Sequence, residues 1–338
     1  MNVLISIIVP CRNEAGYIER FLESVYAQQF DRSRFSLEVL IADGRSDDGT
    51  PALLEAWRRR EPSLVVIDNP LRIVSTGLNA AVERATGTII IRMDVHTTYE
   101  PDYVAQCAET LLATGAACVG GPWRAIGKTP RQVAIADAFM SRVGSGGALS
   151  RNLDYSGTVD TVYLGTWRRE TLARAGGFDE VLVRNQDDEL NLRLKRAGGT
   201  IWQNAAIRSY YVPRDSYGAL FRQFSQYGYW KVPVIRKHRL PASPRQLAPF
   251  LFVAMLATLA VAAPLLPVAG WLGAGLLCVY LLAIAAAAGV LARPRHGLRV
   301  AAALVCMHFG YGTGFGRGLI DFVMLRRAPS VGATRLTR

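Results

Sequence analysis

Charged residues are absent from a long stretch near the C-terminal end of this chain of 338 residues. No Asp, Glu, Lys or Arg occurs between Arg245 and Arg293. Such a stretch has room for two membrane-spanning helices, because each span needs about 20 apolar residues. Basic residues flank it on both sides, as expected when both flanks stay in the cytoplasm next to anionic lipid. The sequence therefore predicts a multi-pass protein of the inner (plasma) membrane, in contact with membrane lipid.

Acidic residues are also scarce near the end of the chain, where eight Arg and a single acid, Asp321, follow residue 246. Much of the net charge of +12 is thus placed beside the apolar stretch. A basic stripe interleaved with aromatic residues, which is typical of nucleic-acid binding, is missing. We therefore expect no nucleic-acid partner.

Features of an exported, disulfide-bonded protein are missing as well. The five cysteines are odd in number, scattered and without a CxxC pair, which favours free thiols in a reducing compartment. The N-terminus, MNVLISIIVP, has neither a basic region nor a small-residue cleavage site. It predicts a first strand and no signal peptide.

The first 115 residues alternate apolar runs with helical patterns. Strands separated by helices of this length imply right-handed βαβ units and a mostly parallel α/β sheet. The expected strands are 4–9, 37–42, 64–67 and 89–93, and the expected helices are 13–26, 50–60, 75–85 and 101–113. Strong helical spacing returns at 187–197, and an aromatic, amphipathic segment follows at 217–231. The latter fits core packing and an interfacial role equally well.

Two to three hydrophobic helices are expected after this segment. The candidates are 247–268, 271–292 and, more weakly, 300–320, whose five glycines and Arg317 are unusual for a span. The predicted organisation is a catalytic or binding domain over 1–231, a basic linker over 232–246, a membrane region over 247–325 and a basic tail over 326–338.

Acidic side chains follow two of the predicted strands. Asp43 ends the second, and Asp94 ends the fourth, with His96 one residue further on. Because ligands bind at the carboxyl ends of strands in open α/β sheets, these residues suit a divalent cation that carries a diphosphate. A surface turn that happens to contain Asp and His remains an alternative.

Two further polar segments can be interpreted either as local structure or as part of a ligand site. Asn13 and Glu14 follow the strand that ends near Pro10, and they either cap a helix or line a nucleotide pocket with the local backbone. Asp187 begins a helix, where the helix dipole favours a carboxylate. Aimed into a pocket, it would take a proton from a sugar hydroxyl.

The order of four motifs resembles that of the family 2 glycosyltransferases with a GT-A fold, within them the bacterial exopolysaccharide transferases of the succinoglycan type. The motifs are IVPCRNE, IADGRSDDGT, MDVH and QDDELNLRLKRAGG, and the match covers about residues 3–231. The resemblance implies inverting transfer from a nucleotide-sugar with Mg2+ or Mn2+. It implies that Asp43 contacts the base, that Asp94 with His96 holds the metal and that Asp187 is the catalytic base.

Two positions depart from the family pattern. His96 replaces the second Asp of the commoner metal motif, and Gln186 stands where Glu usually precedes the base. We expect a UDP-sugar donor and, from the membrane segments, a polyprenyl-linked glycan acceptor, with the catalytic domain in the cytoplasm. The alternatives are a nucleotidyltransferase acting on sugar phosphates and a non-catalytic nucleotide-binding membrane protein.

Overall fold

A computed structural model describes residues 2–291, 296–330 and 334. The chain forms two compact units, one made of Met1–Arg124 and Leu149–Tyr211, the other of Ala125–Ala148 and Val212–Arg338.

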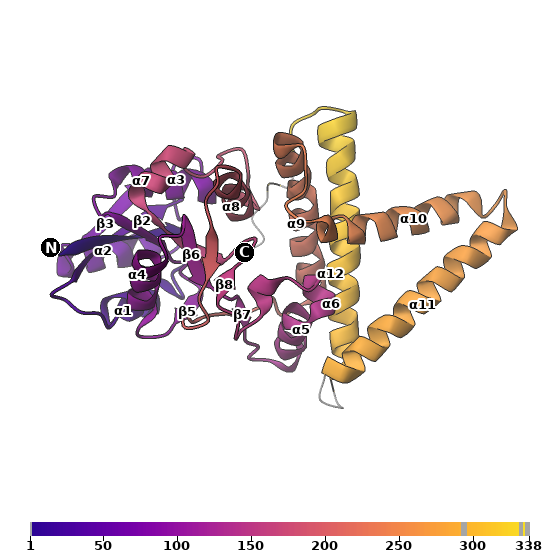
Figure 1. Cartoon of the computed structure of the whole chain (residues 1–338), viewed down its shortest axis with the longest axis horizontal. Helices are drawn as coiled ribbons and strands as arrows, with labels where there is room; N and C mark the ends of the chain where they lie inside the picture. The colour runs from indigo at the N-terminus through magenta and orange to yellow at the C-terminus, as the bar shows by residue number, and fades with distance from the viewer. Residues whose placement is uncertain (1, 292–295, 331–333, 335–338) are drawn as a thin grey trace. The chain divides into compact units, whose positions relative to one another are not determined.

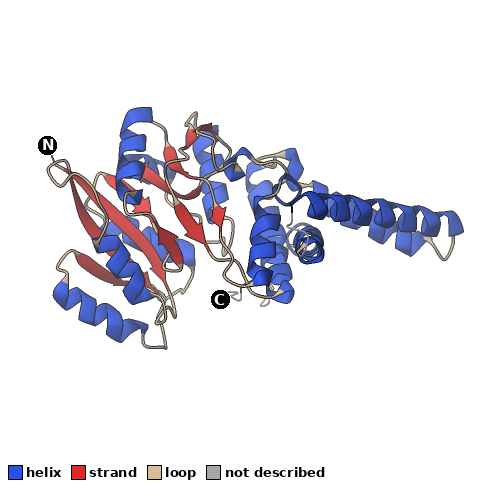
Figure 2. Ribbon diagram, turned by 90° about the horizontal axis from the view of Figure 1, so that it is seen from below, coloured by secondary structure: helices blue, strands red, loops and turns tan. Residues whose placement is uncertain are grey.

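The first unit is built on an eight-stranded, mostly parallel sheet (Figures 1 and 2), as the sequence predicted. Its order is β3-β2-β1-β4-β9-β6-β10-β8. Strand β9 runs antiparallel to both β4 and β6, so it interrupts the parallel series in the middle. The strands are β1 (Val3–Cys11), β2 (Phe35–Asp43), β3 (Leu64–Asp68), β4 (Ile89–Arg92), β6 (Cys118–Gly121), β8 (Gly157–Thr158), β9 (Tyr163–Arg168) and β10 (Ile201–Gln203). A small second sheet has the order β5-β11-β7, with β5 at Thr97–Tyr99, β7 at Arg124–Ala125 and β11 at Ser209–Tyr211.

Helices cover both faces of the large sheet. Alternating residues of β1 point to opposite sides, with Ile7 in one apolar cluster and Ile8 in the other. The first cluster is covered by α1 (Ile18–Tyr26), α2 (Thr50–Arg60) and α4 (Tyr103–Thr114). The second is covered by α3 (Val74–Arg84), α7 (Arg169–Ala175) and α8 (Gln186–Arg196). Because both faces are buried, the central strands are mostly apolar on both sides and do not alternate apolar with polar residues.

The helix predicted from residue 13 begins later, and that prediction is wrong at its start. Asn13 has a left-handed backbone with φ 55°, and residues 14–17 form a turn before α1 begins at Ile18. A left-handed residue cannot belong to a right-handed helix. The loop between β1 and α1 is therefore longer than predicted, which leaves Asn13 and Glu14 outside the helix.

The second unit is helical. It contains α5 (Pro130–Met140), α6 (Arg142–Ser145), α9 (Tyr217–His238), α10 (Ala248–Ala262), α11 (Pro267–Leu291), α12 (Gly297–Gly318) and a π-helical turn at Leu319–Met324. Helix α9 runs through residue 231, where the sequence placed the end of the first domain, and through the first part of the predicted linker. The predicted division into a catalytic domain, a linker, a membrane region and a tail stays a prediction. Residues 331–333 and 335–338 of the predicted tail lie outside the described residues.

Two described helices, Pro244–Ala262 and Pro267–Val290, are long and apolar enough to cross a membrane. They form a hairpin (Figure 1). Its apolar side chains are mostly exposed, including Val290 at 88% and, in the turn between the helices, Leu265 at 84%. Exposed apolar surface on this scale is typical of a lipid or protein contact. The third candidate, α12, instead packs along α9 through glycines. A Cβ added at Gly310, Gly314 or Gly318 would lie within 2.7 Å of an α9 carbonyl oxygen.

Candidate active site

The candidate residues follow strands β1, β2 and β4, which end at one edge of the large sheet. Cys11 pairs with Asp43, and Ile8 pairs with Arg92, so the three parallel strands end close to one another. This is the edge at which open α/β sheets bind ligands. Pro10 lies in β1 opposite Ala42.

Asn13 joins the loop after β1 to the loop after β2. Its side chain donates a hydrogen bond of 2.8 Å to the Asp47 carboxylate and accepts one of 3.0 Å from the Asp47 backbone N–H. Its own backbone N–H donates to the Ser46 hydroxyl at 2.8 Å. Ser46 in turn donates to Asp43 Oδ1 at 2.5 Å. The two loops therefore hold Asp43 in a fixed turn, and the left-handed Asn13 is a structural part of it.

Asp43 and Glu14 both lie within electrostatic reach of the Cys11 thiol. Burial raises the pKa of Cys11, and the charges of Asp43 and Glu14 raise it further. A thiol with a raised pKa stays protonated and unreactive. All five cysteines are free, as the sequence predicted, and Cys11 is not a nucleophile.

His96 lies beside Glu14, with 3.5 Å between Nδ1 and Oε1. Nδ1 is buried and makes no hydrogen bond. A carboxylate suits Mn2+ or Mg2+, whereas an imidazole nitrogen is a softer ligand that transition metals accept more readily, so the predicted pair of Asp94 and His96 fits Mn2+ better than Mg2+. No group of three metal-binding side chains is already assembled among residues 2–291, 296–330 and 334.

Asp94 is held by Arg92, the last residue of β4. The guanidinium donates two hydrogen bonds to the carboxylate, from Nε at 3.0 Å and from Nη2 at 3.2 Å. The Asp94 backbone N–H donates to the Tyr99 hydroxyl at 2.6 Å, and that hydroxyl donates to the Asp94 carbonyl at 3.1 Å. Side chain and backbone of Asp94 are both fixed.

Asp187 lies in the first turn of α8 and accepts a hydrogen bond of 2.9 Å from the Asp188 backbone N–H. Burial lowers the pKa of Arg92, but the charges of Asp94 and Asp187 outweigh burial and raise it. Arg92 thus lies within electrostatic reach of both carboxylates. The neighbouring Gln186 is buried, and its Oε1 makes no hydrogen bond.

Contacts and charges connect most of the predicted residues along this edge. Glu14 lies beside His96, Asp94 precedes His96 by two residues, and Arg92 pairs with Asp94 and lies within electrostatic reach of Asp187. Asp43 and Glu14 both lie within electrostatic reach of Cys11, while Pro10 and Asn13 contribute backbone and loop structure. The sequence reasoning missed Arg92. A single Arg inside the run IIIRM, in a strand expected to be buried, was the available signal, because a buried charge requires a partner.

Aromatic side chains line the region next to His96. Its ring meets Tyr211 edge-on at 6.4 Å, and Trp123 lies 5.0 Å from Tyr211 and stacks on Tyr163 at 5.6 Å. The Arg151 guanidinium sits 3.6 Å from the centre of the Trp123 ring.

Comparison with known proteins decides the family. A model of "Glycosyl transferase family 2" matches residues 6–174. Succinoglycan biosynthesis protein ExoA of Rhizobium meliloti (strain 1021) is 33% identical over 323 residues, which cover 94% of this chain and 95% of that protein. The chain belongs to glycosyl transferase family 2. This family 2 protein is a glycosyltransferase, so the nucleotidyltransferase and non-catalytic alternatives are set aside.

Two other proteins resemble this glycosyltransferase. A Methanococcus voltae enzyme, dolichyl N-acetyl-alpha-D-glucosaminyl phosphate 3-beta-D-2,3-diacetamido-2,3-dideoxy-beta-D-glucuronosyltransferase, is 28% identical and aligns over 69% of this chain and 74% of its own. The mannosyltransferase PcManGT from Pyrobaculum calidifontis, solved with GDP-Man and Mn2+, superposes with a TM-score of 0.62 at 23% identity over 92% of this chain and 87% of that one. The latter likeness shows the shared GT-A fold.

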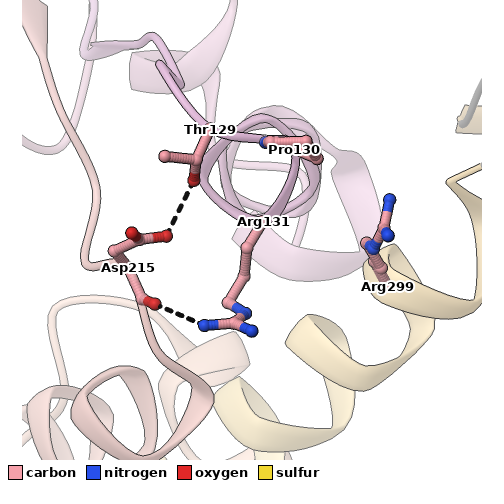
Figure 3. Close-up of a pocket in the computed structure, with 5 residues that line it drawn as sticks. All are labelled: Thr129, Pro130, Arg131, Asp215 and Arg299. Carbon is pink, nitrogen blue, oxygen red and sulfur yellow. Dashed lines mark hydrogen bonds between the residues drawn. The ribbon is translucent and has the colours of Figure 1, made fainter.

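The second unit of the glycosyltransferase contains a polar pocket of about 280 Å³. Thr129 and Asp215 face each other across it, and the Arg131 side chain reaches the Asp215 backbone (Figure 3). The Thr129 hydroxyl donates to the Asp215 carboxylate at 2.7 Å, and Arg131 donates to the Asp215 carbonyl at 2.8 Å. Pro130 and Arg299 complete the lining.

Proposed function

We propose that this glycosyltransferase moves a sugar from a nucleotide-sugar to a lipid-linked glycan at a membrane surface, with inversion at the anomeric carbon. The observation that carries the proposal is the two-pronged hydrogen bond from Arg92 to Asp94 at the carboxyl edge of the sheet, with Asp187 within electrostatic reach of the same guanidinium. It supports a proposed site that contains both the candidate cation-binding residue and the candidate base.

The donor is held along the ends of β1, β2 and β4. Asp43 accepts a hydrogen bond from the nucleobase, and the backbone near Pro10 and Asn13 and the Glu14 side chain line the nucleotide. Asp94 and His96 hold Mg2+ or Mn2+, which supplies charge neutralisation for the departing diphosphate when bound. A UDP-sugar is the donor that we expect, by the role given to Asp43.

Asp187 removes the proton from an acceptor hydroxyl. The acceptor oxygen then forms a bond to the anomeric carbon as the bond from that carbon to the diphosphate oxygen breaks. The nucleoside diphosphate leaves with the bonding electron pair. General base action of this kind contributes roughly 10²–10⁴-fold to the rate.

A polyprenyl-linked acceptor is supported by the apolar hairpin of α10 and α11, which follows the catalytic region in the chain. The Methanococcus voltae relative is named for a dolichyl-linked substrate, and the Rhizobium meliloti relative is named for succinoglycan biosynthesis. We therefore place this enzyme in exopolysaccharide or cell-envelope synthesis. Its basic flanks support a multi-pass inner-membrane location with the catalytic unit in the cytoplasm.

Membrane lipid is a further proposed partner of the enzyme. The pocket of the second unit carries two guanidinium groups, from Arg131 and Arg299, and Arg299 lies near the start of α12, a few residues after the apolar α11 ends. Cations at the end of an apolar span attract anionic headgroups.

A donor screen tests the proposal. Protein purified in detergent is incubated with UDP- and GDP-sugars, Mn2+ and a polyprenyl diphosphate-linked sugar, and the released nucleotide is measured. We expect release of nucleoside diphosphate that depends on the acceptor. Release of pyrophosphate, or no nucleotide release with any donor, contradicts the proposal.

A further inference from the structure

Arg92 is a buried cation that pairs with Asp94 and lies within electrostatic reach of Asp187. The residue is 6% exposed, and two of its three guanidinium nitrogens donate to Asp94. The third, Nη1, is buried without a hydrogen-bond partner. Strand alternation places Arg92 on the side of Ile8 and Ile90, the face that α8 covers. Asp187 belongs to the first turn of α8.

The bidentate pair engages the whole Asp94 carboxylate. Both carboxylate oxygens accept a hydrogen bond from Arg92, and the Asp94 side chain is 15% exposed. Such charge-assisted pairs are strong and geometrically specific. A divalent cation that approaches Asp94 must share these oxygens with the guanidinium, and it meets the positive charge of Arg92 at close range.

A nucleoside diphosphate changes this balance. Its phosphates add negative charge beside Arg92 and supply oxygen ligands that the cation prefers. The cation then gains ligands, and the repulsion from the guanidinium is offset. Cation and diphosphate therefore strengthen each other's binding, and by thermodynamic linkage each does so by the same factor.

We propose that Arg92 is a positioning residue that holds Asp94 in an ion pair, so that Asp94 binds a divalent cation tightly only together with the donor diphosphate. The inference rests on the proposed function, because it takes Asp94 as the cation-binding residue. It assigns to Arg92 a role in the order of binding, separate from the role of Asp187 in proton transfer.

The test measures Mn2+ binding by calorimetry, with and without UDP, and with GDP as the alternative nucleotide. Wild-type protein should bind Mn2+ weakly alone and more tightly with the diphosphate. Arg92→Met frees the Asp94 carboxylate, and it should bind Mn2+ alone about tenfold more tightly, the scale of one lost charge-assisted hydrogen bond. The factor by which UDP strengthens Mn2+ binding should fall accordingly.

Two further variants sharpen this result. Arg34→Met removes one positive charge from an exposed pair, Arg34 with Glu109 at 3.2 Å, and should leave both affinities as in wild type. Arg92→Lys keeps the charge but presents one nitrogen in place of the fork, and should lie between wild type and Arg92→Met. If Arg92→Met does not fold, Arg92→Lys serves as the test variant. A gain of affinity cannot arise from a loss of structure.

The outcomes separate the inference from the function it rests on. Wild-type protein that binds no Mn2+ with either diphosphate overturns both. Wild-type protein that binds Mn2+ with a diphosphate, together with Arg92 variants of unchanged affinity and unchanged coupling, overturns the inference alone.

Discussion

Glu38 and Ser6 face each other across the parallel pair of β2 and β1, and the Ser6 hydroxyl donates a hydrogen bond of 2.5 Å to Glu38 Oε1. The same oxygen accepts from the backbone N–H of Thr86 at 2.7 Å and of Gly87 at 3.0 Å. One carboxylate therefore ties two central strands to the turn that leads into β4.

Replacing Glu38 should destabilise the first unit in a pH-dependent way. Burial raises the pKa of Glu38, but hydrogen bonds from Ser6, Thr86 and Gly87 outweigh burial and lower this pKa below its ordinary value. A lowered pKa in the folded state stabilises the protein above the pKa of the unfolded chain, and this contribution is lost as pH falls through the folded-state pKa. We expect Glu38→Gln to lose about 1–3 kcal/mol near neutral pH.

Denaturant unfolding of wild type and Glu38→Gln between about pH 7 and pH 3 measures this difference. The difference in the free energy of unfolding between the two proteins should become smaller at the acidic end of this range. Glu109→Gln, at an exposed ion pair, serves as the control and should change stability by less than about 1 kcal/mol. A gap that stays constant over this range would falsify the assignment.

The glycines of α12 provide a second prediction. A Cβ at Gly314 would lie 2.0 Å from the Ser225 carbonyl oxygen of α9, whereas a Cβ at Gly316 would lie 3.5 Å from the Phe250 ring. Gly314→Ala should cost about 1–3 kcal/mol through overpacking. Gly316→Ala, in the same helix, should be neutral or stabilising by up to about 1 kcal/mol, because Ala favours helix.

Thermal unfolding in detergent, followed by tryptophan fluorescence, compares the two alanine variants directly. The expected order of midpoints is Gly316→Ala at or above wild type and Gly314→Ala below it. Equal midpoints for the two variants would show that α9 and α12 do not pack through Gly314.

Much of the first unit could be predicted from the sequence. The strand predicted at 89–93 has apolar residues on both faces, with Arg92 as the exception, and Pro51 marks the start of α2, whose bounds of 50–60 agree with the structure. Local signals of this kind lie within one segment. The carboxyl ends of parallel strands meet at one edge, and for this reason the sequence predicts that Asp43 and Asp94, which follow two such strands, lie along it.

The rest depends on partners that are distant in the chain. The antiparallel β9 enters the sheet between β4 and β6, and no local pattern specifies that position. The glycines of α12 appeared unusual for a span because their partner, α9, lies about eighty residues earlier. The left-handed Asn13 is held by Asp47 in another loop, so its helix-capping composition was misleading. Arg92 was missed because a strand is predicted from its run of apolar residues, and one charged residue within the run does not change that prediction.

The pocket of Thr129, Asp215 and the two arginines leads to a third prediction. Anionic lipid should stabilise the protein more than neutral lipid does, because a ligand that binds the folded state raises its stability. Each arginine near an anionic headgroup contributes about 1 kcal/mol, or roughly fivefold in affinity. Arg131→Ala and Arg299→Ala should each reduce the effect.

Melting temperatures in detergent with added phosphatidylglycerol or phosphatidylcholine measure this preference. Arg174→Ala, an exposed arginine near Glu170 in the first unit, is the control and should respond as wild type does. A phosphatidylglycerol effect of the same size in all four proteins would exclude this pocket as the headgroup site.

The fourth prediction concerns Asp187, the candidate base. Asp187→Asn keeps the shape of the side chain but cannot accept the acceptor proton, so turnover should fall roughly 10²–10⁴-fold. Donor binding should persist, because the proposed function assigns the nucleobase to Asp43 and the cation on the diphosphate to Asp94. Asp188→Asn removes the same charge from the same helical turn and should retain turnover.

Turnover is measured as acceptor-dependent release of nucleoside diphosphate, and donor affinity is measured by calorimetry on the same samples. The decisive quantity is the ratio of the two effects. A base acts only on the reaction, so the loss must appear in the rate and not in the dissociation constant of the donor. If Asp187→Asn weakens donor binding as much as it slows turnover, Asp187 binds the donor and the proton must leave by another group. If Asp188→Asn is the inactive variant instead, the base is one residue further along α8.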